Sequence, residues 1–156
     1  IGFERGTSEH AGNRNYFGQQ GIVAAKTHPI RAALARISKV RASSPALQRG
    51  LQVNIELKGD RAAFYRVYQH DGRHQIALVL LNKGDAPQDF AIERMLQAGT
   101  WRSALEGGEI EVARGGKLEA SVPAHGVQVF LLDAAVSDPA LKAALDTAMA
   151  GARRAQ

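Results

Sequence analysis

The 156-residue chain contains no cysteine, which excludes disulfide bonds, thiolate metal sites and cysteine catalysis but does not fix the cellular compartment. It has no apolar run near the roughly 18–20 residues needed to span a bilayer. The longest run, IALVLL at residues 76–81, has the length of a buried strand. The basic start and apolar core of a signal peptide are also missing, so we expect none within these residues. We predict no membrane partner.

Common catalytic motifs are absent as well. The sequence contains no G-x-S-x-G, H-E-x-x-H, Walker or G-x-G-x-x-G pattern. This excludes the usual signatures of α/β-hydrolases, zinc proteases, nucleotide triphosphatases and dinucleotide-binding domains. We predict no cofactor and no metal.

Acidic residues are scarce in the first third of the chain only. Residues 1–50 carry eight Lys or Arg against two acids, a net charge of +6, whereas residues 51–156 carry twelve against thirteen, a net of −1. An overall charge of +5 alone would fit a nucleic-acid-binding protein. Because no nucleic-acid motif accompanies the basic part, we predict no nucleic acid and favour an acidic protein partner.

What is present is typical of one folded domain, because 45% of the residues are hydrophobic and 22% are charged. The stretch THPIRAALARISKVRASSP predicts a helix over residues 28–42, with Thr27 or His28 as its cap and Pro29 at its first position. Its apolar positions recur at spacings of three and four and are Ile30, Ala33, Leu34, Ile37 and Val40. Arg41 falls on the same side, so we expect it to be paired or to extend over the surface.

Beyond Gly50 the apolar period is two. LQVNIELK puts Leu51, Val53, Ile55 and Leu57 on one face, while QIALVLLN at 75–82 is apolar on both faces and predicts a central strand. Glycine turns separate eight short strands, the pattern of an antiparallel sandwich. The strands are expected at residues 51–58, 62–69, 75–82, 88–93, 100–105, 109–113, 117–122 and 127–133.

We expect the sandwich, from about residue 49 to 133, to be the folding unit. Its expected buried residues are Leu51, Val53, Ile55, Phe64, Ile76, Leu78, Leu80, Trp101, Val129 and Leu131. A further helix is predicted near the C-terminus, capped by Asp138 and begun by Pro139. Its apolar stripe is Leu141, Ala144, Leu145, Ala148 and Met149.

Several side chains have the residue types or spacings found in metal sites or catalytic sites. His70 and His74 have the spacing of a helical metal site, but they flank an Asp-Gly turn and are predicted to be exposed turn residues. Glu109 and Glu111 share a strand face, and an exposed edge strand explains them better than a pair of glycosidic carboxylates.

Two further features have plain structural explanations. ARGGK at 113–117 resembles a phosphate nest but fits a hairpin turn. Trp101, the only tryptophan, is favoured as a core anchor over a sugar-stacking platform. His125 lies in the turn PAHG, and we assign it no role.

Residues 6–21, GTSEHAGNRNYFGQQG, show no apolar period. Such a segment is either a linker or a loop built to contact something.

The junction RISKVRASSPALQRG at 36–50 resembles the α-amylase superfamily, in which the last helix of a (β/α)₈ barrel passes into an antiparallel C-terminal domain. The strands at 62–69 and 76–82, GTWRSALEGG at 99–108 and SVPAHGVQVFLL at 121–132 are similar to successive pieces of that domain. The likeness leans toward cyclomaltodextrin glucanotransferases and bacterial α-amylases.

The same resemblance extends back through IGFERGTSE and GNRNYFGQ, which look like the eighth barrel strand and the loop after it. It implies a mainly β fold in three parts. Residues 1–47 would be a remnant of the barrel end, with the tail of the eighth strand, the substrate-side loop and the last helix. Residues 48–133 would form an antiparallel Greek-key β-sandwich, and residues 134–156 a C-terminal helix. This last part lies outside the likeness. His70 and Asp71 echo a family catalytic motif, but that motif precedes the eighth strand, so we reject the match.

The resemblance implies a larger enzyme, here called the parent, that cleaves or transfers α-glucosidic bonds by a retaining double displacement. This chain would be its C-terminal fragment, non-catalytic by itself, with no catalytic residue. Its partners would be the missing catalytic barrel, α-glucan through the intact parent only, and a second copy through the exposed helix face.

The substrate-binding candidates by resemblance are Asn13, Arg14, Tyr16 and Phe17. For the parent we favour an extracellular or periplasmic location. The alternatives are a free-standing carbohydrate-binding β-sandwich and an interaction domain whose basic helix docks a partner.

Overall fold

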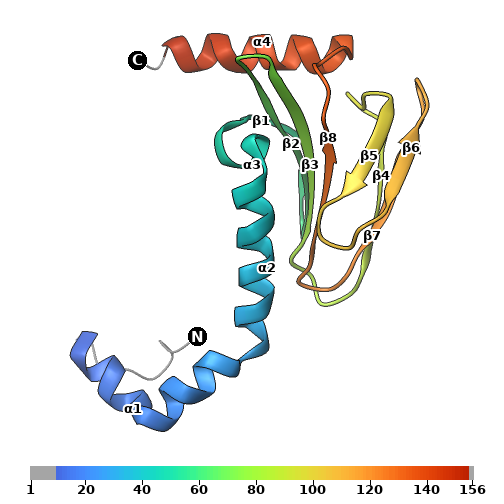
Figure 1. Cartoon of the computed structure of the whole chain (residues 1–156). Helices are drawn as coiled ribbons and strands as arrows, with labels where there is room; N and C mark the ends of the chain where they lie inside the picture. The colour runs from blue at the N-terminus through green and yellow to red at the C-terminus, as the bar shows by residue number, and fades with distance from the viewer. Residues whose placement is uncertain (1–9, 155–156) are drawn as a thin grey trace. The chain divides into compact units, whose positions relative to one another are not determined.

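A computed structural model describes the backbone of residues 10–154 and the side chains of residues 18–151. Figure 1 shows the order of the elements along the chain. The chain divides after Lys39 into two compact units, Ile1–Lys39 and Val40–Gln156. Each unit is described by itself below. Among the described residues, no helix combines the length and the apolarity that crossing a membrane requires.

The N-terminal unit is helical. Helix α1 runs from His10 to Thr27 and is broken at Gly18, whose φ of 54° lies outside the helical region. The loop expected at residues 6–21 is therefore wrong from His10 onward, while residues 6–9 lie outside the described part. The segment has no apolar stripe, and its backbone groups pair along the helix.

Helix α2, Pro29–Ser43, confirms the predicted helix. His28 caps it: its Nδ1 accepts the backbone N–H of Ile30 at 3.3 Å, and its carbonyl accepts that of Arg31 at 2.9 Å. No side chain of α2 is fully buried. Ile30, Leu34 and Ile37 are 43%, 56% and 40% exposed.

A short helix that the sequence analysis missed follows α2. Helix α3, Pro45–Arg49, has Ser44 as its N-cap, and the Ser44 side chain accepts the backbone N–H of Leu47 at 3.2 Å. The Ser-Pro pair that ends α2 thus also begins α3. Arg41 donates to the carbonyl of Leu47 at 3.3 Å, which confirms the expectation that this arginine is paired.

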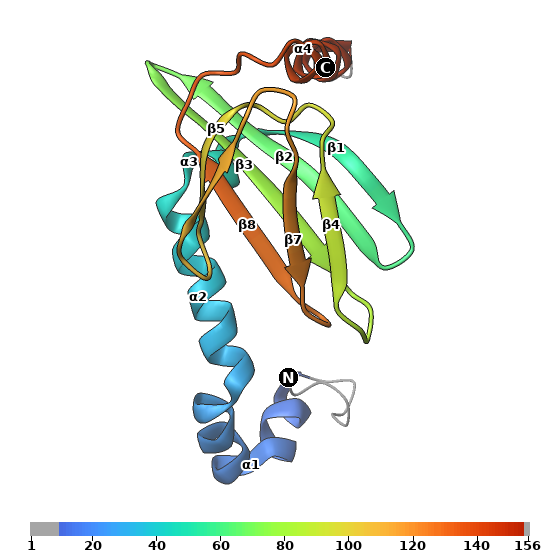
Figure 2. The same ribbon diagram turned by 90° about the vertical axis from the view of Figure 1, so that its right-hand side faces the viewer.

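The described part of the second unit contains eight strands in two sheets, and Figure 2 shows β4 and β7 side by side. The strands are β1 (Leu51–Lys58), β2 (Arg61–His70), β3 (Arg73–Asn82), β4 (Gln88–Ile92), β5 (Gly99–Ser103), β6 (Glu109–Val112), β7 (Leu118–Val122) and β8 (Val127–Leu132). One sheet has the order β1-β2-β3-β8-β5-β6, and β4 pairs with β7 in the other. All pairs are antiparallel, so the mainly antiparallel β architecture is confirmed.

The six-stranded sheet is apolar on both faces. Its inner face packs against β4 and β7, and Ile76, Leu78 and Leu80 of β3 are fully buried there. Its outer face carries a second cluster, in which Val79 and Val129 pack with Ala46 of α3. Strand β3 is therefore covered on both sides, as its sequence predicted. Of the ten residues expected to be buried, Leu51, Ile55 and Phe64 are only partly so.

A β-bulge breaks the perfect alternation expected for β1. The register with β2 shifts between Asn54 and Glu56, so Ile55 is the extra residue. The residues beyond the bulge change faces: Glu56 turns inward, and Leu57 turns outward with 64% of its side chain exposed. The inward position of Leu57 predicted from the sequence is wrong.

The charge that the bulge turns inward is paired. Glu56 lies 3.2 Å from the Nε of Arg61, whose guanidinium also stacks 4.2 Å from the ring centre of Phe90. Arg61 further donates to the carbonyl of Asp89 at 2.7 Å. The guanidinium and its partners close this end of the inner core.

Helix α4, Pro139–Arg154, crosses one end of the sandwich (Figure 1). Asp138 caps it as predicted, since its side chain accepts the backbone N–H of Leu141 at 2.8 Å. Leu141 and Leu145 are 0% and 7% exposed and belong to the inner core. The compact unit thus extends past the sandwich expected at 49–133 and includes α4.

Candidate functional site

The four substrate-binding candidates lie in one stretch of backbone. Asn13, Arg14, Tyr16 and Phe17 occupy the part of α1 before the break at Gly18. Their side chains lie outside those that the structure describes. The site that the sequence places here therefore stays a prediction, and its backbone is helical rather than looped.

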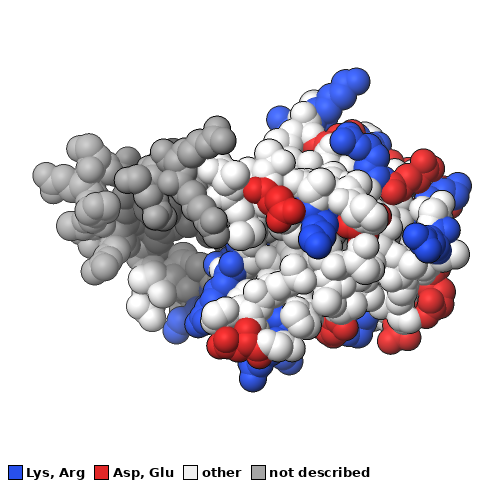
Figure 3. Space-filling view, turned by 90° about the horizontal axis from the view of Figure 1, so that it is seen from above, with Lys and Arg blue, Asp and Glu red and all other residues white. Residues whose placement is uncertain are grey.

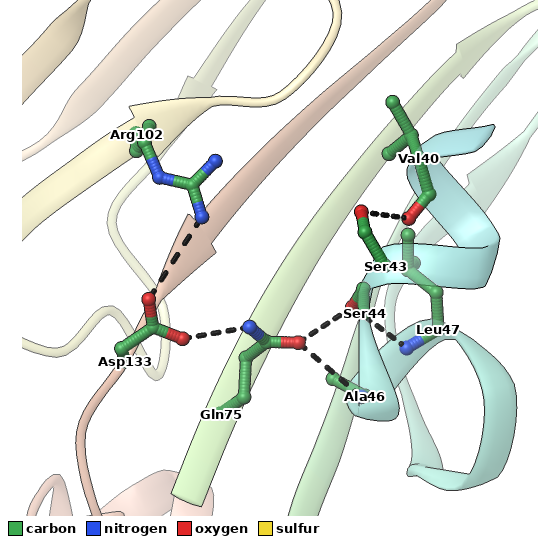
Figure 4. A network of polar contacts seen from close by, with 8 residues as sticks. All are labelled: Val40, Ser43, Ser44, Ala46, Leu47, Gln75, Arg102 and Asp133. Carbon is green, nitrogen blue, oxygen red and sulfur yellow. Dashed lines mark hydrogen bonds and ion pairs between the residues drawn. The ribbon is translucent and has the colours of Figure 1, made fainter. Parts of the chain in front are cut away.

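In the second unit, a polar network ties helix α3 to the six-stranded sheet (Figure 4). The side-chain oxygen of Gln75 on β3 accepts a hydrogen bond from the Ser44 hydroxyl at 2.5 Å and one from the backbone N–H of Ala46 at 3.3 Å. Its amide nitrogen donates to Asp133 at 2.6 Å. Arg102 of β5 lies 3.8 Å from the same carboxylate. Both Ser44 and Gln75 are buried.

This network is an anchor rather than a catalytic centre. A retaining glycosidase needs two carboxyl groups about 5–5.5 Å apart, and the network holds only one, that of Asp133, which is exposed. Its buried members are an amide and a hydroxyl with their hydrogen bonds satisfied. Such a group fixes helix α3 against the six-stranded sheet.

A second buried amide holds the far end of β3. The amide nitrogen of Asn82, which is 2% exposed, donates to the carbonyls of Ala86, Pro123 and Val122 at 2.8, 3.0 and 3.2 Å. Its oxygen accepts the backbone N–H of Gly84 at 2.9 Å. One side chain thus joins β3 to the loop after it and to the turn between β7 and β8.

Asn82→Ala is expected to destabilise the unit by about 1–3 kcal/mol, because it removes the four hydrogen bonds that the buried Asn82 amide makes. The matched control is Asn54→Ala on β1, where the amide is exposed and the change should stay within about 0.5 kcal/mol. Urea unfolding of both variants measures the difference. Equal midpoints for the two variants would contradict the role given to Asn82.

A third buried amide, that of Gln97, holds the segment that leads into helix α4. Its amide donates to the carbonyl of Ala135 at 2.8 Å and accepts the backbone N–H of Ser137 at 2.6 Å. Its own carbonyl accepts the indole N–H of Trp101 at 2.9 Å. The sequence analysis did not predict that the amides of Gln75, Asn82 and Gln97 are buried and join separate segments. The only indication of this role was a polar residue beside an otherwise apolar strand.

The histidines lie where the sequence predicted. His70 and His74 are exposed at the β2–β3 hairpin, and His70 lies 3.1 Å from the neighbouring Asp71. His125 lies 3.0 Å from Asp85 at the surface. Within residues 10–154, no three or more His, Asp or Glu side chains gather in the way that would hold a metal ion.

Glu109 and Glu111 also have the structural role predicted for them, on an exposed edge strand. Glu109 and Glu111 are exposed on β6, which is an edge strand of the six-stranded sheet. The carboxylate of Glu111 accepts a hydrogen bond from the hydroxyl of Thr100 on the neighbouring strand. Surface contacts of this kind do not position a general acid.

Trp101 and the glycine turn at residues 113–117 also have the structural roles predicted from the sequence. Trp101 is fully buried, with its ring centre 6.3 Å from that of Tyr65, so it is a core anchor and no sugar platform. Residues 113–117 form a turn closed by a 2.9 Å hydrogen bond from the N–H of Gly116 to the carbonyl of Ala113.

Two pKa shifts are explained by local contacts. Burial raises the pKa of the Tyr65 hydroxyl well above its ordinary value, and the charge of Asp138 adds to the rise. A hydrogen bond to Glu119, with attraction to its charge, raises the pKa of the exposed Lys117 ammonium. Perturbed groups mark catalytic sites when they face a cleft, but Tyr65 lies in the packed core and Lys117 on the surface.

Charge on the surface is mixed. Figure 3 shows Lys and Arg side by side with Asp and Glu over the coloured part of one face. This agrees with the net charge of −1 of residues 51–156. The face shown carries no broad positive area of the kind that binds a phosphate backbone.

No protein-family model and no curated protein matches the sequence, but solved structures match the fold. An α-amylase from Anoxybacillus matches 68% of this chain with a TM-score of 0.55 and 20% identity. An α-amylase from Geobacillus thermoleovorans, complexed with acarbose, matches 65% with a TM-score of 0.56 and 19% identity. A structure of AmyP in complex with maltose matches 68% with a TM-score of 0.53 and 21% identity.

This chain spans only 23%, 22% and 20% of the lengths of those three proteins. At such identities the likeness shows the fold alone. The resemblance to the α-amylase superfamily seen in the sequence is thereby confirmed at the level of the fold, for a part that makes up about a fifth of such enzymes.

Proposed function

We propose that this chain is the C-terminal, non-catalytic part of an α-glucan-active enzyme of the α-amylase type. The observation that carries the proposal is the shared fold with α-amylases, matched over 65–68% of this chain and only 20–23% of theirs. The order of sequence pieces that resembles the family over residues 1–133 supports it independently. Two of the matched proteins were seen with acarbose or maltose, which favours α-glucan as the substrate class of the parent.

The proposal assigns a part to each segment. Residues 1–47 end the catalytic barrel, 48–133 form the sandwich with a Greek-key path, and 134–156 add the C-terminal helix. The parent is a hydrolase or a transferase of the cyclomaltodextrin glucanotransferase kind, because the residues that choose between water and a sugar acceptor lie in the barrel. Asn13, Arg14, Tyr16 and Phe17 contact the glucan there, and the polar network around Gln75 holds helix α3 against the sandwich.

The alternative, a free-standing carbohydrate-binding sandwich, is less favoured. Such modules usually present several aromatic rings to sugar. Here Trp101, Tyr65 and Phe90 are buried in the core. Chromatography of this chain on immobilised α-glucan separates the two: we expect no retention, whereas a binding module would be retained.

The chain alone is expected to release no reducing sugar from starch, maltodextrin or cyclodextrin, because the nucleophile and the general acid belong to the barrel. The measurement is a reducing-sugar assay on the purified chain. The control is the Glu109→Gln variant, which removes a surface carboxylate. Activity in the chain that this variant abolishes would overturn the proposal, and so would a coding sequence without a barrel before Ile1.

A further inference from the structure

A small pocket opens beside α3, between this helix and strands β2 and β3. It has a volume of about 260 Å³, and all the residues that line it belong to the second unit. Its charged side chains are those of Arg49, at the end of α3, and Arg73, at the start of β3. Tyr68 of β2 lies between them in the lining, and none of the described residues that form the pocket is acidic. We call this cavity the arginine pocket.

The two arginines of the arginine pocket lack acidic partners. Within residues 18–151, neither Arg49 nor Arg73 forms an ion pair. The acids closest to them in the sequence are Glu56 and Asp71, and each has a basic partner of its own, at 3.2 and 3.1 Å. Two positive charges in one pocket repel each other, and an anion bound between them removes this repulsion.

Hydrogen bonds fix the wall of the pocket before anything binds. The side-chain amide of Gln48 donates to the carbonyl of Ala42 at 2.7 Å, and Arg41 donates to the carbonyl of Leu47 at 3.3 Å. Both bonds hold α3 against the end of α2. The ring of Tyr68 packs on the outer core cluster of the six-stranded sheet. Ligand pockets are usually formed in advance in this way, because ordering them on binding costs affinity.

A third arginine adds positive charge on the same side of the sheet. Arg66 lies two residues before Tyr68 on β2, so the two side chains share a face and start about 7 Å apart. The Nε of Arg66 is buried and has no hydrogen-bond acceptor among the described residues. Most buried donors in proteins do have one. The potential at this end of the outer face is therefore positive, although residues 51–156 as a whole have a net charge of −1.

We infer that the arginine pocket binds a phosphate group. A phosphate carries up to two negative charges and has several acceptor oxygens, so it accepts guanidinium groups that come from two different elements. A planar carboxylate is satisfied by one such group. The hydroxyl of Tyr68 provides a further donor.

The size of the pocket limits what else the ligand can be. Pockets that enclose a drug-sized molecule have volumes of about 300–1,000 Å³, whereas this one has about 260 Å³. It therefore suits a single phosphate, either free or carried as a monoester by a molecule that extends into solvent. The site lies in this chain alone and does not depend on the proposed function.

Calorimetric titration of the chain with inorganic phosphate, at constant ionic strength, tests the inference. We expect saturable binding at one site. Arg49→Gln and Arg73→Gln should each raise the Kd by roughly ten- to a hundredfold, because each removes charge-assisted hydrogen bonds. The matched control is Arg94→Gln, which removes the same charge from an exposed position between β4 and β5 and should leave the Kd within about twofold. Since Arg49 and Arg73 are exposed, the urea midpoints of their variants should equal that of the unsubstituted chain.

Three outcomes would overturn the phosphate site. They are no saturable binding to the unsubstituted chain, an equal loss of affinity in Arg94→Gln, and binding of acetate as tight as that of phosphate, which would assign the pocket to a carboxylate. A titration with methyl phosphate then identifies the source of the group. Binding of this ester at least as tight as that of inorganic phosphate supports a phosphate carried by a larger molecule, and weaker binding supports the free ion. None of these results changes the proposed function, which depends on the coding sequence before Ile1.

Discussion

Leu78→Ala is expected to lower the free energy of unfolding by about 2–5 kcal/mol, the usual cost of emptying a core leucine site. Leu78 is fully buried at the centre of β3, which pairs with β2 on one side and β8 on the other. Its neighbours come from both sheets, so they cannot close the cavity without shifting β3. Urea or guanidinium unfolding of the purified chain gives the value.

The matched control is Leu34→Ala, the same change at a leucine that is 56% exposed. It should alter the unfolding free energy by less than about 0.5 kcal/mol, as surface substitutions generally do. If Leu78→Ala also stays below this limit, β3 is not the central strand and the core assignment fails.

Most of the sandwich could be predicted because its strands carry their own period. The doubly apolar β3 follows from burial on two faces, and the alternation of β1 follows from pleat geometry up to the bulge at Ile55. Trp101 was predicted as a core anchor for the same reason, and it is fully buried. Glycine turns then set the boundaries, and those of β1 agree residue for residue with the prediction.

What the sequence did not predict depends on contacts between different strands, loops and helices. The bulge at Ile55 interrupts the regular hydrogen bonding between β1 and β2. It turns Glu56 inward, where Glu56 pairs with Arg61 on β2. The burial of Gln75 and Asn82 likewise requires partners 29–58 and up to 41 residues away in the chain. No local pattern reports such partners.

The helical conformation of α1 is another feature that local sequence patterns did not predict. Its sequence has no apolar stripe and contains glycine, which lowers helix propensity. Local patterning therefore favoured a loop, whereas the isolated chain satisfies its backbone within a helix broken at Gly18. In the parent, contacts with the barrel compete with those helical hydrogen bonds, and we propose that the segment is then the substrate-side loop.

Arg14→Ala in the parent is expected to lower kcat/KM for maltodextrin by roughly ten- to a hundredfold. In TIM barrels the loops at the C-terminal face build the active site, and the segment around Arg14 resembles the loop after the eighth strand. A guanidinium offers several donors in a fixed fork that sugar hydroxyls can accept. Hydrogen bonds to a charged group contribute about 1.5–3 kcal/mol each, which gives the expected loss.

The rival role for Arg14 is to brace the loop by pairing with a carboxylate of the barrel. Kinetics and the melting temperature, measured together on Arg14→Ala, separate the two roles. Reduced kcat/KM at an unchanged melting temperature supports contact with glucan, whereas a lowered melting temperature with intact kinetics rejects the site. Arg14→Lys keeps the charge but loses the fork, so a glucan contact predicts that it restores little activity. Arg36→Ala, at an exposed arginine of α2, is the control and should change neither quantity.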